Sequence, residues 1–160
     1  MANNSKKIFM NEEFDIHIKR NEKFFIIDDY IKDISFEIPN ADAFINAQQN
    51  LDKYATTIDI KSLPLTNPLI EINIRLTLQA PLNLLNKIHS EVCLAVIAKI
   101  YPNPSLSKDE VQRLILVDIP NLYSEKISNI ITNLFQQSGF KNFSFKQKLD
   151  FTKFYEEKRL

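Results

Sequence analysis

The sequence predicts an α+β fold, in which a four-stranded antiparallel sheet carries a long kinked helix and a short C-terminal helix on one face. Two observations support this prediction. Apolar and polar residues alternate, as they do along strands, in several segments between residues 24 and 101, whereas helical spacing begins only after residue 107. Chains that segregate strands from helices in this way typically place the helices on one face of an antiparallel sheet.

The first expected strand covers residues 24–38 and is interrupted near Asp28 and Asp29. In its second half, Asp33 and Glu37 fall on one face, and isoleucine and phenylalanine residues fall on the other. The two carboxylates are then about 13 Å apart, four residues at roughly 3.3 Å each, which is too far for a catalytic pair. Periodicity alone predicts an edge strand with a solvated acidic face.

Two further segments alternate in the same way. Residues 40–53 are expected to form a polar loop that contains a helical turn, and the second strand then covers residues 56–63. It stops at Pro64, because proline cannot donate to a strand ladder. The third strand, residues 70–80, has the clearest alternation in the chain, which indicates an antiparallel strand with one wet face.

The fourth expected strand, residues 85–101, is apolar on both faces between residues 92 and 98. Val92 and Leu94 share one of these faces. A strand of this kind is usually covered on both sides. The second apolar face of this strand could be covered in two ways according to the sequence: by another subunit, or by the helices and N-terminal arm of the same chain.

The helical part begins at Ser107 and Glu110, which have the spacing of a capping box. We expect an interruption near Pro120, where the ring removes a hydrogen bond and clashes with the preceding turn. The helix then resumes with one buried apolar stripe and ends at Gly139, a suitable C-cap. After a short extended segment, a last amphipathic helix is expected to begin at about Asp150.

The composition is that of one globular domain. The chain has 160 residues, of which 44% are apolar and 25% charged, and we expect a flexible arm over residues 1–23 before a single domain over residues 24–160. The lone cysteine, Cys93, excludes an internal disulfide and fits a reducing compartment. Because the N-terminus lacks an apolar signal core and no apolar run approaches the ~20 residues of a membrane span, we expect a cytoplasmic protein without direct membrane insertion.

The sequence offers no catalytic, metal or cofactor site. A single glycine, Gly139, excludes phosphate-binding loops, which need several. His17 and His89 do not have the spacing of metal ligands, and Cys93 and His89 would lie ~13 Å apart on a strand. A net charge of zero argues against nucleic-acid binding. We therefore expect neither an enzyme nor a bound cofactor.

Charge and aromatic residues are unevenly distributed. Residues 28–42 contain five acids and one lysine, which makes this segment a candidate docking surface for a basic partner. Residues 139–160 contain six bases and three acids. Seven of the 17 phenylalanine and tyrosine residues lie at or after residue 135. Most of these will be core, but they also suit the rim of a groove that accepts extended apolar segments.

In order along the chain, these segments resemble the SecB export-chaperone family. The similar segments are the acidic strand KDISFEIPN, Ile58-Asp59-Ile60, residues 72–80, Glu91-Val92, Pro120-Asn121, Gly139-Phe140 and the Asp150–Tyr155 helix start. The chain lacks the paired glycines after Glu-Val, the Phe-Pro-Tyr-Ala-Arg stretch, the proline before the last helix and the acidic tail of the family. It therefore resembles a divergent member.

The resemblance implies a homotetramer, a dimer of dimers, that binds unfolded precursor proteins without ATP, keeps them translocation-competent and passes them to the SecA motor. Together with the C-terminal aromatics, matched family positions indicate client-binding residues: Phe44, Leu51, Ile58, Ile60, Phe143, Phe151, Phe154 and Tyr155. SecA binding is expected at Asp33, Glu37 and Glu91, and the tetramer interface at Val92 and Leu94.

Two alternatives remain open at this point. One is a SecB-like chaperone dedicated to a single client, such as an antitoxin. The other is a small antiparallel-sheet enzyme of the hot-dog type, although that fold wraps its sheet around a central helix and no long helix precedes the strands here.

Overall fold

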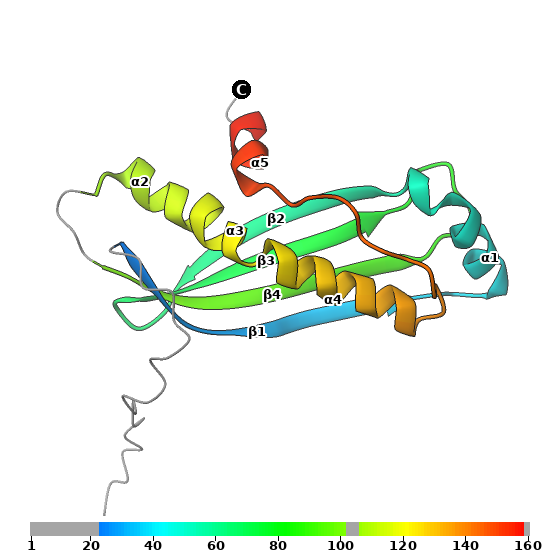
Figure 1. Ribbon diagram of the computed structural model, residues 1–160, viewed down its shortest axis with the longest axis horizontal. Helices are drawn as coiled ribbons and strands as arrows, with labels where there is room; N and C mark the ends of the chain where they lie inside the picture. The colour runs from blue at the N-terminus through cyan, green and yellow to red at the C-terminus, as the bar shows by residue number, and fades with distance from the viewer. Residues whose placement is uncertain (1–22, 102–105, 159–160) are drawn as a thin grey trace, which may run out of the picture.

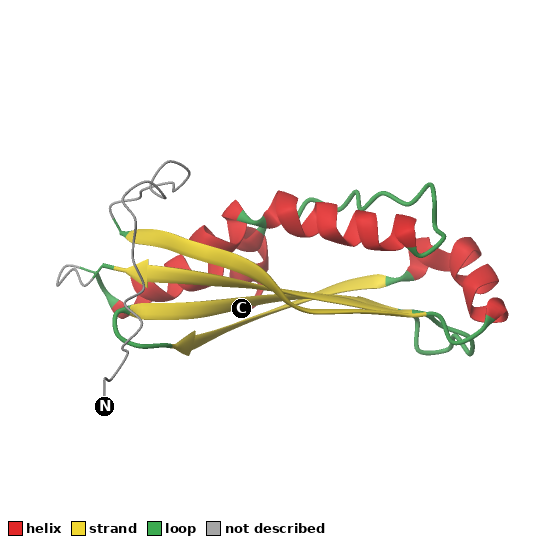
Figure 2. Ribbon diagram, turned by 90° about the horizontal axis from the view of Figure 1, so that it is seen from below, coloured by secondary structure: helices red, strands yellow, loops and turns green. Residues whose placement is uncertain are grey.

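The expected strands assemble into one four-stranded antiparallel sheet with helices on one side, which confirms the predicted fold class (Figures 1 and 2). The computed structural model describes residues 23–101 and 106–158. The expected flexible arm, residues 1–23, lies outside these ranges except for Lys23.

The strand order in the sheet is β1-β4-β3-β2, and every neighbouring pair is antiparallel. The strands are β1 (Phe24–Glu37), β2 (Ala55–Pro64), β3 (Leu69–Gln79) and β4 (His89–Ile100). The first three agree closely with the sequence prediction. The fourth begins at His89 rather than at residue 85, because residues 81–88 form a loop in which Leu85 is 95% exposed.

The first strand is continuous where an interruption was expected. It contains two β-bulges, one between Ile26 and Asp28 and one between Ile31 and Asp33. Each bulge adds a residue that has no partner, so the strand stays paired while its alternation shifts by one. As a result Asp29 turns to the helix side of the sheet, where it forms an ion pair with Lys126.

A helix replaces most of the polar loop that was expected before the second strand. Helix α1 (Ala41–Asn50) starts at Asn40, whose Oδ1 accepts a hydrogen bond from the Ala43 N–H at 2.8 Å, and the short 3-10 helix η2 (Leu51–Lys53) follows. The helix buries Ala43 and Ala47, four residues apart. Because small residues make these contacts, no stripe of large apolar residues marks this helix in the sequence.

The long kinked helix begins as predicted. Helix α2 (Lys108–Arg113) has a complete capping box, in which Ser107 Oγ accepts from the Glu110 N–H and the Glu110 carboxylate accepts from the Ser107 N–H at 2.8 Å. A π-helical turn η3 (Leu114–Asp118) and helix α3 (Ile119–Leu122) follow. The break falls at Tyr123, because Pro120 occupies the first turn of α3, where its missing N–H is tolerated.

Helix α4 (Ser124–Gln137) ends in a Schellman motif, in which Gly139 follows the C-cap residue Ser138 and terminates the helix as predicted. The φ of Gly139 is 104°, the Phe140 N–H donates to the Phe135 carbonyl at 3.0 Å, and the Gly139 N–H donates to the Gln136 carbonyl at 3.3 Å. Only glycine adopts this φ without strain. The motif turns the chain back over the sheet toward α5 (Phe151–Lys158), which starts beside Asp150 as expected (Figure 1).

The core lies between the sheet and the helices of the same chain. We call the two sides of the sheet the helix-covered face, which carries even-numbered residues of β3 and β4 such as Leu94, and the open face, which carries odd-numbered ones such as Cys93. On the helix-covered face, Val92 and Leu94 are 0% exposed, as are Ile127 and Ile131 of α4.

This arrangement places Val92 and Leu94, which were predicted at the tetramer interface, in the core of their own chain. Both side chains lie under the helices of their own chain, so they have no surface to offer a second subunit. On the open face, Cys93 and Ala95 are also buried, at 1% and 0% exposure, although none of the described helices covers them. Longer side chains on the neighbouring strands enclose these two small residues.

Candidate functional site

A hollow of about 750 Å³ lies where α1 and η2 meet the segment that follows α4. We call it the apolar hollow. Its lining residues are Phe44, Gln48, Leu51, Gly139, Phe140, Lys141, Asn142, Phe143, Ser144 and Lys146. The structure therefore brings together three of the predicted client-binding residues, Phe44, Leu51 and Phe143, from segments that lie far apart in the sequence.

The Schellman motif shapes the floor of this hollow. By reversing the chain, it packs the Phe140 ring against the Phe135 ring in a tilted arrangement, with ring centroids 5.4 Å apart, and Phe44 then packs on Phe140 at 4.9 Å. A Cβ atom at Gly139 would lie only 3.1 Å from the Phe44 ring. Gly139 thus serves both the turn and the close approach of Phe44, which places α1 beside the hollow.

Phe143 is held at the edge of the hollow by two contacts with α4. Its ring stacks on Phe135 with centroids 4.0 Å apart, and its carbonyl accepts a hydrogen bond from Gln136 Nε2 at 2.9 Å. The ring is nevertheless only half-buried. An aromatic surface that is fixed in place and partly open to solvent can bind apolar groups with little loss of side-chain entropy.

The other predicted client-binding residues are not part of the apolar hollow. Ile58 and Ile60 lie on the helix-covered face of β2, half-buried against the core. Phe154 and Tyr155 are half-buried on α5. Phe151 is 1% exposed and belongs to the core, so in this conformation its ring offers no surface to a client.

The three residues that were expected to bind SecA all lie on the open face. Asp33 pairs in register with Cys93, Glu37 pairs with His89, and Glu91 extends the row on β4. Arg75, on β3, forms ion pairs with Glu91 and, at 3.6 Å, with Asp33. This partial neutralisation of the carboxylates was not predicted from the sequence, although Arg75 lies on the solvent-facing side of the third predicted strand.

A second polar cluster lies further along the open face. The carboxylate of Glu71, only 7% exposed, accepts a hydrogen bond from the Tyr30 hydroxyl at 2.6 Å and another from the Lys32 ammonium. The hydrogen bond from Lys32 lowers the pKa of Glu71 and raises the pKa of Lys32. Between the two clusters, burial raises the pKa of the Cys93 thiol, which therefore stays protonated and unreactive.

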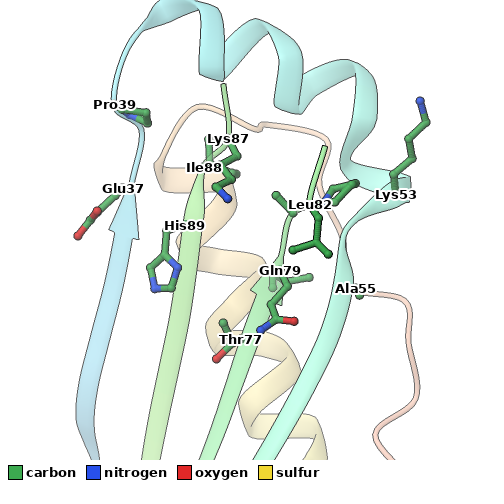
Figure 3. Close-up of a pocket in the computed structure, with 13 residues that line it drawn as sticks. Glu37, Pro39, Lys53, Ala55, Thr77, Gln79, Leu82, Lys87, Ile88 and His89 are labelled. Atoms are coloured by element: carbon green, nitrogen blue, oxygen red, sulfur yellow. The ribbon is translucent and has the colours of Figure 1, made fainter. Parts of the chain in front are cut away.

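A second hollow, of about 710 Å³, lies at the α1 end of the open face (Figure 3). Glu37 and His89 project into it from neighbouring strands, and Leu82, which is fully exposed, overhangs it from the β3–β4 loop. Within the described residues, no group of three side chains could hold a metal ion. Among the helices that the structure describes, none is long and apolar enough to cross a membrane.

The apolar hollow and the row of carboxylates on the open face suit a protein that binds other polypeptides. Comparison with known proteins identifies the family. The sequence profile described as preprotein translocase subunit SecB matches residues 17–160. The chain therefore belongs to the SecB family of protein-export chaperones, which confirms the resemblance seen in the sequence and the prediction that the protein is not an enzyme.

Individual relatives agree with this assignment. A protein of Pelagibacter ubique, provisionally named protein-export protein SecB, is 34% identical over 137 residues, which cover 86% of this chain and 97% of the relative. The protein-export protein SecB of Rhodospirillum rubrum is 23% identical over 126 residues, covering 79% of this chain and 76% of that protein.

A solved structure has the same fold. It is the Mycobacterium tuberculosis SecB-like chaperone in complex with a ChAD peptide from an antitoxin, and it superposes with a TM-score of 0.60. The match covers 81% of this chain and 89% of that chain at 9% sequence identity. This likeness confirms the α+β, SecB-like architecture.

Proposed function

We propose that this protein is an ATP-independent chaperone of the cytoplasm, which binds unfolded precursor proteins, keeps them translocation-competent and delivers them to the SecA motor. The observation that carries the proposal is the apolar hollow, whose partly open aromatic rings come from α1 and from the segment after α4.

The physical basis is the burial of apolar side chains. An unfolded chain exposes such side chains, and each one that is buried contributes roughly 1.5–3 kcal/mol. The start of β2, directly after η2 and before Lys61, also has one side without a strand partner among the described residues, so an extended client can form main-chain hydrogen bonds there. Because neither contribution depends on a particular sequence, we expect the chaperone to accept many clients.

The double substitution Leu51→Asn with Phe143→Asn should weaken capture of an unfolded protein at least tenfold, since it removes apolar area from the floor and the edge of the hollow. The measurement is suppression of aggregation of a denatured client, with circular dichroism to verify folding. Phe151 is unsuited to this test, because its ring is part of the core.

The control is Leu63→Asn with Leu65→Asn at the β2–β3 hairpin, where the two side chains are 48% and 42% exposed. This variant removes comparable apolar area away from the hollow and should keep full capture. If both variants capture the client as well as the unaltered protein does, the apolar hollow is not the client site.

We also propose that the protein assembles into a homotetramer, a dimer of dimers, through β1 rather than through β4. On this edge strand Ile31 and Ile34 face the helix side of the sheet, yet they are 47% and 45% exposed.

Native mass spectrometry should therefore detect a tetramer, and Ile31→Glu with Ile34→Glu should reduce the mass of the assembly while the subunit stays folded. Leu63→Glu with Leu65→Glu is the matched control, and a monomeric unaltered protein would contradict the proposal.

A chaperone dedicated to one client is the second candidate function. It is favoured by the fold shared with the SecB-like chaperone whose structure holds an antitoxin peptide. A pull-down separates the two candidates, because a general export chaperone should retain many unfolded proteins, whereas a dedicated one should retain a single partner.

A further inference from the structure

The charged side chains among the described residues that line the apolar hollow are all positive. They are Lys141 and Lys146, and none of the described lining residues is an aspartate or a glutamate. Lys148 follows two residues later and is also exposed. None of the three lysines forms an ion pair with any residue that the structure describes. Their ammonium groups are therefore available to a ligand in the hollow.

The main chain between these lysines is held in place. The Phe143 N–H donates to the Phe140 carbonyl at 2.9 Å, and the Phe145 N–H donates to Thr132 Oγ1 at 3.1 Å. Because Gln136 also binds the Phe143 carbonyl, Lys141 and Lys146 belong to an anchored segment, one before and one after Phe143 in the sequence. Both lysines therefore line the hollow from a main chain that is fixed in place.

The described acidic residues closest in sequence to the hollow, and those of the open face, do not line it. Asp33, Glu37 and Glu91 lie on the open face, where Arg75 already binds two of them. Asp42 and Asp52 are on α1 and η2, next to lining residues in the sequence, but neither lines the hollow. A ligand in the hollow therefore meets aromatic rings in the middle and lysines at the margin.

We infer that the apolar hollow selects extended apolar segments whose flanking residues are acidic over segments flanked by lysine or arginine. This inference rests on the proposed chaperone function and specifies the class of client. The apolar centre of a client segment binds the rings of Phe44 and Phe143, while flanking carboxylates approach Lys141 and Lys146. A lysine-flanked segment meets like charges at both ends and gains only the apolar contact.

The expected discrimination is modest, because exposed ion pairs are individually weak. The acid-flanked peptide is attracted at both flanks, whereas the lysine-flanked peptide is repelled at both. We expect the first to bind about five- to thirtyfold more tightly than the second. Salt should remove most of this difference, since the Debye length falls to about 3 Å at 1 M. Binding of the apolar centre should persist under those conditions.

The test uses the full chain and three fluorescent peptides with the same apolar centre and with aspartate, serine or lysine flanks. Fluorescence anisotropy should rank the affinities as aspartate above serine above lysine at low salt, with the three converging at about 1 M salt. The variant Lys141→Glu with Lys146→Glu should reverse the ranking. Lys61→Glu with Lys108→Glu, which makes the same change in net charge away from the hollow, should preserve it.

The outcomes distinguish a failure of the proposed selectivity for acid-flanked segments from a failure of the proposed chaperone function. Equal affinities for the three peptides at low salt, or a ranking that the Lys141→Glu, Lys146→Glu variant leaves unaltered, would overturn the selectivity while the chaperone function stands. If none of the peptides binds and denatured proteins are not captured either, the proposed function itself fails.

Discussion

Replacing Leu94 by aspartate is expected to unfold the subunit rather than to dissociate an assembly. Leu94 is 0% exposed and belongs to the core between the sheet and the helices. Truncation to alanine alone should cost about 2–5 kcal/mol. A buried carboxylate without a partner adds a desolvation penalty, and the sum is comparable to the ~5–15 kcal/mol that stabilises a typical domain. Circular dichroism and thermal unfolding of Leu94→Ala and Leu94→Asp measure both effects.

The control for this prediction is the same change at an exposed site. Leu63→Asp on β2, where the leucine is 48% exposed, should change stability by less than about 1 kcal/mol. If Leu94→Asp instead gave a folded subunit of reduced assembly mass, the side chain would have to face another subunit, and the placement of β4 described here would be wrong.

The double substitution Asp33→Lys with Glu37→Lys is expected to weaken the proposed SecA binding strongly while client capture is preserved. Both carboxylates lie on the open face, on the opposite side of the sheet from the helices. Arg75 already neutralises part of the acidic row, so few carboxylates remain to attract a basic partner. Reversing two of them should weaken binding by on the order of 10- to 100-fold and remove its salt dependence.

The matched control is Glu125→Lys with Glu156→Lys, which makes the same change in net charge on helices α4 and α5. Titration of SecA at several salt concentrations should separate the two variants. Equal losses of affinity would mean that only net charge matters, and unaltered affinity in the Asp33, Glu37 variant would place SecA docking on another surface.

Local signals in the sequence predicted local structure well. The capping box at Ser107, the C-cap at Gly139 and the alternation of residues 70–80 each concern a few neighbouring residues, so tertiary contacts were not needed to interpret them. Helix α1 escaped this kind of analysis, because its buried residues Ala43 and Ala47 carry little apolar area.

The candidate sites were only partly predictable for a related reason. The residues Phe44, Leu51 and Phe143 were identified by their type and by family resemblance, but their meeting in one hollow depends on the chain reversal after α4. The ion pairs of Arg75 with Asp33 and Glu91 depend on the registers of three strands, β1, β3 and β4. Register is set by the packing of whole faces, which a single segment does not reveal.

The sequence by itself determined the fold class, the approximate strands, the start and end of the long helix and the membership of a chaperone family. Only the tertiary structure decided which side of each strand is covered. A period of two residues separates two faces without saying which one meets the helices, and both faces of β4 are apolar at Val92 and Cys93. The helices cover Val92 on one face. On the open face, Cys93 is buried because it lies between the longer polar residues Asp33 and Arg75 on the adjacent strands.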